Sequence, residues 1–254
     1  MDIMKNLIII IIGILILFIN PTIVIAGRTI SNLPNYKYTA LGDSIATGFG
    51  AKESYVHIYT RYLKNDLPAN ISLSNLSKNG LTSTDLYNLI KNNNAVRRSI
   101  SISQIVTFNI GSNDFLNARD AYKAGICGGV DNQDCLRMVL ATFKVNWTNI
   151  VMEIQSLRSP QNTVIRTINL YNSKVNEDMP DDFLVFKLYL DQANDHIANS
   201  GVNFADVYTA FNGPNHNIDP ADLGLLQKDD AHPNDAGQLL IADLLRALGY
   251  VPLK

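Results

Sequence analysis

The sequence has few of the features that mark several common classes of protein. Its 254 residues include two cysteines, one tryptophan and four histidines, and 21 lysines and arginines are balanced by 23 aspartates and glutamates, a formal net charge of -2. Without an excess of positive charge, we expect no nucleic-acid partner and no polybasic contact with a membrane. Hydrophobic residues make up 46% of the chain, which excludes a mainly disordered protein.

Motifs for bound nucleotides and metals are also missing. Gly42, Gly48 and Gly50 lie close together, but no Gly-Lys-Ser/Thr follows them and the chain has no Gly-x-Gly-x-x-Gly. A zinc site needs three or four ligands at suitable spacing, and the cysteines and histidines form no such cluster. The histidines are scattered, at His57, His196, His216 and His232.

Long hydrophobic runs are confined to residues 1–26. Lys5 precedes an apolar run of thirteen residues, 7–19, and Pro21 interrupts any helix beyond it. Small residues at alternate positions then end the segment at Val24-Ile25-Ala26. This order is typical of a secretory signal, with cleavage predicted after Ala26.

An uncleaved membrane anchor is the alternative, because residues 7–26 come close to the roughly 20 residues of a membrane span. Pro21 and the short uninterrupted run favour cleavage. The expected product is an exported chain of 228 residues that is not inserted in the membrane, and no second apolar run approaches membrane length.

The two cysteines become informative if the chain is exported. Cys127 and Cys135 enclose the polar, glycine-rich segment GGVDNQD, and an oxidising compartment would let them pair. By the chain-entropy estimate, closing so short a loop contributes about 2.5 kcal/mol. We therefore expect a local disulfide.

Short β-rich runs alternate with longer helical patterns after residue 26. Apolar residues at steps of three and four, Trp147 among them, predict a long helix whose buried stripe includes that tryptophan. The expected strands are 36–41, 71–76, 104–110, 163–170 and 202–207, and the expected helices are 54–67, 82–91, 135–158, 181–199 and 235–248. This alternation predicts one three-layer α/β domain over residues 27–254, with a five-stranded parallel sheet.

Four polar motifs follow predicted strands or precede the last helix. Ligands of such sheets bind beyond the carboxyl ends of the strands, which is where these motifs lie. They are Gly42-Asp43-Ser44, Ser77 to Thr82 with Gly80, Gly111-Ser112-Asn113-Asp114, and Asp229 to Asn234 with His232.

These residue types fit acyl transfer. A serine hydroxyl needs a base to take its proton, and the base needs a third group to fix its tautomer. Ser44, His232 and Asp229 are the candidates for these roles. The developing oxyanion needs aligned hydrogen-bond donors, and the candidates are the backbone N–H groups of Ser44 and Gly80 and the side-chain amide of Asn113.

With its four motifs in family order, the chain resembles the GDSL lipases and esterases of the SGNH-hydrolase superfamily, from about residue 36 to 245. The resemblance implies a flavodoxin-like fold, Ser44 as nucleophile, His232 as base and Asp229 as its orienting acid, with Ser44, Gly80 and Asn113 as the oxyanion hole. It also implies hydrolysis of a small ester, a lipid or an acylated sugar without metal or cofactor. The loop 170–173 matches no substrate subgroup.

Several alternatives remain open at this stage. Ser44 could be a helix N-cap, and Asp230 could replace Asp229 if the register differs by one. Asp43 and Asp114 are more simply loop-bonding residues than paired glycosidase carboxylates. A non-enzymatic module that binds flavin or carbohydrate is the alternative function.

The segment 115–135, which contains both cysteines, follows the third motif. We expect it to form a disulfide-closed loop over the acyl pocket, where such loops alter the preference for substrate size.

Overall fold

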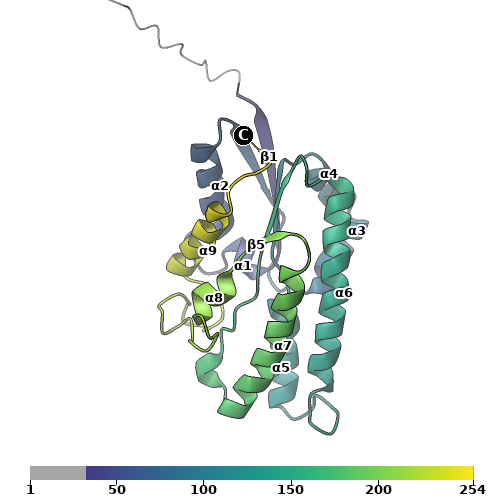
Figure 1. Ribbon diagram of the computed structural model, residues 1–254, viewed down its shortest axis with the longest axis vertical. Coiled ribbons are helices and arrows are strands. Elements are labelled where there is room, and N and C mark those ends of the chain that lie inside the picture. Colours follow the sequence, from purple (N-terminus) through teal and green to yellow (C-terminus); the bar gives the residue numbers. More distant parts are fainter. Residues whose placement is uncertain (1–32, 254) are drawn as a thin grey trace, which may run out of the picture. The chain divides into compact units, whose positions relative to one another are not determined.

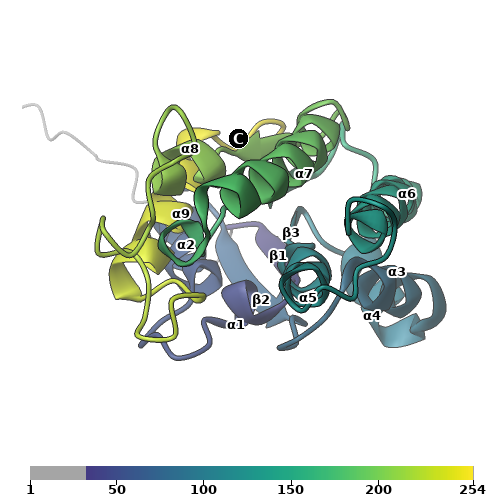
Figure 2. The ribbon, with the colours of Figure 1, turned by 90° about the horizontal axis from the view of Figure 1, so that it is seen from below.

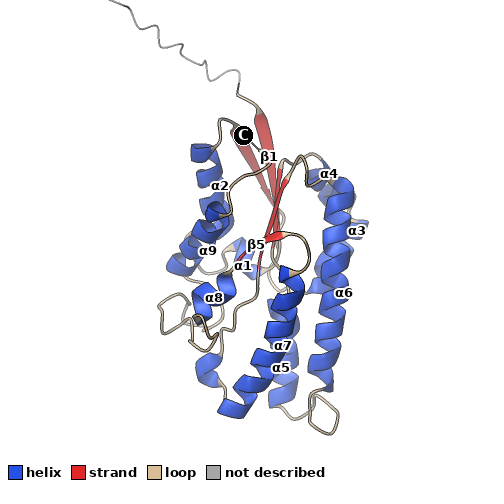
Figure 3. Ribbon diagram, in the orientation of Figure 1, coloured by secondary structure: helices blue, strands red, loops and turns tan. Residues whose placement is uncertain are grey.

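Five parallel strands form the centre of the computed structural model, which describes residues 33–253 (Figure 1; Figure 3). Every residue of the central strand β3 and of its neighbour β4 is buried, as expected for a sheet covered on both faces. The order of the strands is β2-β1-β3-β4-β5, which is the flavodoxin-like order. Their bounds are β1 Asn35–Leu41, β2 Asn70–Asn75, β3 Ile105–Phe108, β4 Val164–Ile168 and β5 Asn203–Ala205. The predicted α/β fold with a five-stranded parallel sheet is confirmed.

Helices cover both faces of this sheet (Figure 2). On one face α2 (Tyr55–Asp66) packs against α9 (Asp235–Ala247). On the other, α6 (Asp134–Leu157) packs against its neighbours. Those neighbours are α3 (Ser83–Asn92), α4 (Asn94–Ser101), α5 (Ser112–Lys123) and α7 (Pro180–Ala198).

The longest helix, α6, has the predicted buried stripe. Trp147 is completely buried, and its ring centroid lies 5.1 Å from that of Phe108 in β3 and 5.5 Å from that of Phe143 one turn earlier. The periodic apolar residues therefore fix this helix against the sheet, and Trp147 belongs to the core.

The expected loop over residues 115–135 is wrong for its first half. Residues 115–123 belong to α5, whose only buried residues are Asp114 and Ala118. So short an apolar stripe gives little helical periodicity to read from the sequence. Four other short elements also escaped prediction: α1 (Ser44–Thr47), α4, the 3-10 helix η2 (Val175–Glu177) and α8 (Val207–Asn212).

The second half of that segment is a loop closed by the expected disulfide. Cys127 and Cys135 are bonded, and the Cys135 N–H also donates to the Cys127 carbonyl at 2.9 Å. The predicted signal and its cleavage point after Ala26 lie outside the described residues. Within residues 33–253, no helix combines the length and the apolar character that crossing a membrane requires.

Candidate active site

The first and third motifs meet where the strand order reverses, between β1 and β3. Ser44 follows β1 as the first residue of α1, and it is 7% exposed. The N-cap of that helix is Asp43, whose carboxylate accepts from the Ile45 N–H at 2.9 Å. The interpretation of Ser44 as an N-cap is therefore wrong, and its hydroxyl is left available for another partner.

The backbone before Ser44 needs a glycine. Gly42 has φ +149°, and a Cβ there would lie 2.2 Å from the Asn109 side-chain oxygen. Two hydrogen bonds hold the Asn109 side chain in place. Its Nδ2 donates to Asp43 Oδ1 at 2.7 Å, and its oxygen accepts from the Tyr55 hydroxyl at 3.0 Å. This buried network fixes the turn that carries Ser44.

Asp43 is completely buried, and only one of its oxygens has a partner among the described residues. Burial raises the pKa of this carboxyl to about 6, although the hydrogen bonds from Ile45 and Asn109 oppose the shift. Asp114 is also structural, because its two oxygens accept from the backbone N–H and the hydroxyl of Ser83. Neither carboxylate belongs to a glycosidase pair.

The last motif places His232 between Ser44 and Asp229. His232 Nε2 lies 2.9 Å from Ser44 Oγ, and His232 Nδ1 lies 2.6 Å from Asp229 Oδ2. The other oxygen of Asp229 accepts from the backbone N–H groups of Ala231 and His232, at 3.1 and 3.0 Å. Partial burial opposes ionisation of Asp229, but these hydrogen bonds hold the pKa of its carboxyl below the usual value.

Two amide side chains connect α9 to the loop that carries His232 and to the turn that carries Ser44. Asn234 is the N-cap of α9, and its Nδ2 donates to the carbonyls of Gly224 and Leu226, each at 2.8 Å. Gln238, one turn into α9, is completely buried. Its oxygen accepts from the Tyr55 N–H at 2.7 Å and its Nε2 donates to the Ile45 carbonyl at 3.1 Å. Gln238 thus ties α9 to the turn that carries Ser44.

Tyr171 is a further contact to this loop that sequence reasoning missed. Its hydroxyl donates to the Ala231 carbonyl at 2.6 Å, and its ring centroid lies 4.7 Å from that of Phe211. Lys174 Nζ lies 3.4 Å from the carbonyl oxygen of Asp229. The only signal in the sequence was the position of residues 170–173, directly after a strand.

The other two candidates for the oxyanion hole, Asn113 and Gly80, differ in whether they line the pocket beside Ser44. Asn113 lines the same pocket as Ser44 and His232, and its Nδ2 donates one hydrogen bond to the Leu81 carbonyl at 2.9 Å. Gly80 is not among the residues that line this pocket. It has φ +79°, and a Cβ there would meet nothing within 4 Å. Its backbone conformation, and not the close approach of a neighbour, is thus what favours glycine at this position.

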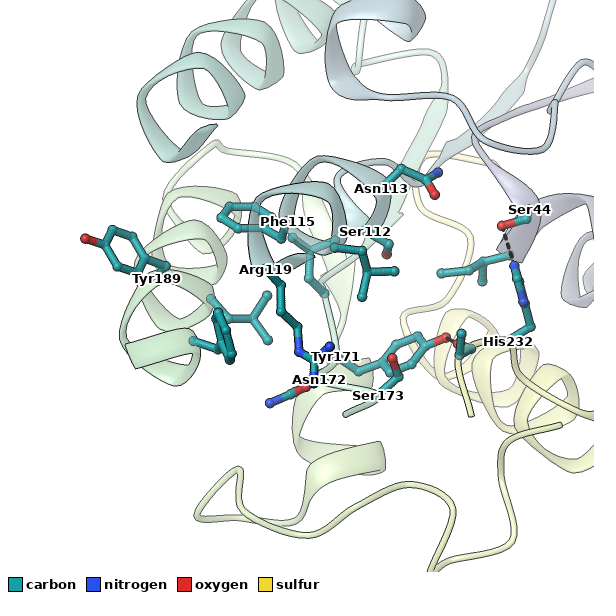
Figure 4. Close-up of a pocket in the computed structure, with 16 residues that line it drawn as sticks. Ser44, Ser112, Asn113, Phe115, Arg119, Tyr171, Asn172, Ser173, Tyr189 and His232 are labelled. Atoms are coloured by element: carbon teal, nitrogen blue, oxygen red, sulfur yellow. Dashed lines mark hydrogen bonds between the residues drawn. The ribbon is translucent and has the colours of Figure 1, made fainter. Parts of the chain in front are cut away.

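A pocket opens beside Ser44 and His232 and continues between α5 and α7 (Figure 4). The empty space beside these residues, including space open to solvent, is about 790 Å³. Most of the lining is apolar: Ile45, Phe115, Leu116, Leu170, Tyr171, Phe186, Tyr189, Leu190 and Ala231. No residue of the disulfide-closed loop lines it.

The remaining histidines lie elsewhere. His57 contacts the Ser54 hydroxyl, His196 contacts Thr148, and His216 stacks on Tyr208. Across residues 33–253, no group of three or more His, Cys, Asp or Glu side chains is placed to hold a metal ion.

Comparison with known proteins gives consistent matches. Residues 40–240 match the GDSL-like lipase/acylhydrolase family. A spore germination lipase from Bacillus licheniformis is 24% identical over 220 residues, which cover 84% of this chain and 96% of the relative. Among solved structures, a lipase from a goat rumen metagenome has a TM-score of 0.72 at 22% identity, with 86% and 100% of the two chains covered. An acetylxylan esterase from Geobacillus stearothermophilus has a TM-score of 0.60 at 20% identity, with 87% and 98% covered.

Proposed function

The chain belongs to the GDSL-like lipase/acylhydrolase family and is an ester hydrolase, and from this premise we propose that Ser44, His232 and Asp229 are its catalytic triad. The observation that carries the proposal is the pair of contacts on His232, at 2.9 Å to Ser44 and 2.6 Å to Asp229. A module that only binds flavin or carbohydrate would leave this relay of hydrogen bonds without a purpose.

The first half of the reaction forms an acyl-enzyme. Ser44 Oγ attacks the carbonyl carbon of the ester while His232 Nε2 takes its proton, and the carbonyl oxygen becomes an oxyanion. The intermediate then collapses, its bond to the alcohol oxygen breaks, and His232 returns the proton to the departing alcohol. Asp229 stays ionised throughout and stabilises the imidazolium.

The second half releases the acid. Water attacks the acyl carbon and His232 takes its proton, and the bond to Ser44 Oγ breaks as His232 reprotonates the serine. The donors to the oxyanion in both halves are the Ser44 N–H and the Asn113 amide, which line the pocket. Gly80 does not line it, and its N–H is assigned as the third donor from its motif alone. One hydrogen of Asn113 Nδ2 already bonds the Leu81 carbonyl, which orients the amide and leaves the other hydrogen for the oxyanion.

The apolar lining supports a substrate whose acyl part is a hydrocarbon chain. The pocket wall includes Ile45 and Leu170, together with Phe115 of α5 and Leu190 of α7. Burying such a chain between these side chains contributes binding energy that an acetyl group cannot supply. We infer that the natural ester is a lipid-like or other acylated compound with a chain longer than acetyl.

A fluorophosphonate tests the nucleophile directly. The unmodified protein should take up one phosphonyl group, and peptide mapping should place it on Ser44. Ser44→Ala should lose labelling and lower kcat for p-nitrophenyl butyrate by roughly 10⁵-fold or more. Ser112→Ala, which changes another serine of the same pocket, should still be labelled. A Ser44→Ala protein with full activity would exclude the proposed nucleophile.

Export is a separate proposal that rests on residues 1–26. Expression in a secreting host should yield protein in the medium whose first residue is Gly27. Protein that keeps residues 1–26 and remains with the membrane fraction would instead identify the segment as an anchor.

A further inference from the structure

We propose, resting on the triad above, that Arg119 limits the length of the acyl chain this hydrolase accepts. Arg119 is the one arginine or lysine among the described residues that line the pocket, where most of its neighbours are apolar. A charged side chain is unexpected in a pocket that binds an acyl chain, and the position of Arg119 in the pocket suggests a role for it.

Arg119 is held firmly in place. Its Nη2 lies 2.6 Å from Asp178 Oδ1 and 3.5 Å from Glu177 Oε2. The Asp178 side chain is completely buried and that of Arg119 is 12% exposed. The guanidinium carbon also lies 5.4 Å from the centre of the Phe186 ring. Moving Arg119 aside would leave a buried carboxylate with less compensation, which is costly.

The side chain stands between two parts of the pocket. In Figure 4, Arg119 extends from α5 with Ser44 and His232 on one side and Tyr189 on the other. Its contact with Phe186 agrees with this placement, because Phe186 and Tyr189 both come from α7. In the view of Figure 4, an acyl chain attached to Ser44 and extended toward Tyr189 passes Arg119 on its way.

This arrangement predicts a break in the dependence of rate on chain length. Each methylene buried before Arg119 should raise kcat/KM by about fourfold. A longer chain meets a guanidinium fixed by its ion pair, so further methylenes bury little additional surface. The preferred acyl group is therefore of intermediate length, longer than acetyl and shorter than the long chains of membrane lipids.

The unmodified protein gives the first measurement. We expect kcat/KM for p-nitrophenyl esters, measured below the concentration at which the esters aggregate, to rise from acetate and then level off or fall. Rates are divided by the number of sites that react with a fluorophosphonate, so that misfolded protein does not contribute. A continuous rise up to palmitate would overturn the proposal without any variant.

The second measurement removes the barrier. In Arg119→Met/Asp178→Asn both charges of the pair are lost together, so no unpaired buried charge remains. The ratio of kcat/KM for decanoate to that for butyrate should increase at least tenfold, since two newly buried methylenes at about fourfold each already give roughly 16-fold. Arg119→Lys keeps the charge and should keep the unmodified profile.

Lys123→Gln is the matched control. Lys123 lies one turn further along α5 and 3.4 Å from the same Asp178 oxygen, but it does not line the pocket. Its removal should leave the profile unchanged. A double variant that hydrolyses butyrate and keeps the unmodified profile would overturn the role of Arg119 while the triad stands. If the unmodified protein is not labelled on Ser44 by the fluorophosphonate, the proposed triad itself is overturned.

Discussion

The hydroxyl of Tyr171 donates a hydrogen bond to the carbonyl of Ala231, the residue directly before His232, across 2.6 Å. Tyr171 comes from the loop after β4 and is 8% exposed, so this contact joins a buried side chain to the loop of the proposed base. It gives the histidine a support that is independent of Asp229.

Tyr171→Phe tests this support. The variant leaves the Ala231 carbonyl without its donor, so we expect about 1 kcal/mol less stability. A small displacement of His232 should lower kcat by roughly tenfold with little change in KM. Tyr62→Phe is a suitable control, because it removes a hydrogen bond to Asp243 on the exposed surface. Equal losses of kcat in the two variants would contradict a positioning role for Tyr171.

Asp229→Asn tests the acid that orients His232. The amide can present a donor to Nδ1 and stabilise the wrong tautomer, so kcat should fall by roughly 10³–10⁴-fold. Asp230→Asn is the matched control: its backbone has φ +49°, which asparagine tolerates, and its activity should be close to that of the unmodified protein. A larger loss in Asp230→Asn would move the acid by one residue.

The lowered pKa of Asp229 also fixes the sign of a pH effect. A carboxyl whose pKa is lower in the folded state contributes stability above its usual value of 3.8, and the contribution is lost as the pH falls through the folded pKa. The difference in unfolding free energy between the unmodified protein and Asp229→Asn should therefore shrink on acidification. Denaturant unfolding at several pH values measures it, and a growing difference would contradict the assignment.

Asp43 should show the opposite dependence. Its pKa is about 6 in the folded protein, above the usual 3.8, so the native state holds the proton more tightly and loses stability as the pH rises between these values. The loss is on the order of 3 kcal/mol. Asp43→Asn cannot titrate, so the unmodified protein should gain stability relative to this variant as the pH falls from 7.5 to 4. A pH-independent difference would show that Asp43 is not buried as a neutral acid at low pH.

The disulfide should contribute stability without taking part in the chemistry. Replacing both cysteines by serine, Cys127→Ser/Cys135→Ser, should lower the unfolding free energy by about 2.5 kcal/mol, as expected for so short a loop. Labelling of Ser44 should persist, since no residue of that loop lines the pocket. Loss of labelling at a temperature where the variant is still folded would contradict this separation.

The sequence was sufficient to predict the helices and strands whose apolar residues recur with a strong period. Helix α6 and strand β3 were predicted within a few residues, because Trp147 and Phe108 belong to patterns that only one kind of element can bury. Helix α5 was missed, since Asp114 and Ala118 are the only buried residues along its length.

The residues of the candidate site could be chosen from their sequence motifs. The contacts that hold them in position could not be predicted in this way. Ser44, His232 and Asp229 stand in short patterns that can be read along the chain. The contact of Tyr171 with Ala231 and the ion pair of Arg119 with Asp178 each join residues about sixty positions apart. Such contacts depend on how loops meet in the folded chain, and no local pattern encodes them.

The link that Gln238 makes between α9 and the turn of Ser44 has a consequence for synthesis on the ribosome. The proposed nucleophile Ser44 is made early, but the proposed base His232 lies 188 residues later, and helix α9 comes after it. A nascent chain that has folded β1 to β5 thus carries a serine that nothing activates. With the proposed triad, hydrolysis begins only when the last helix has left the exit tunnel, so an unfinished chain would not attack the esters of the cell that makes it.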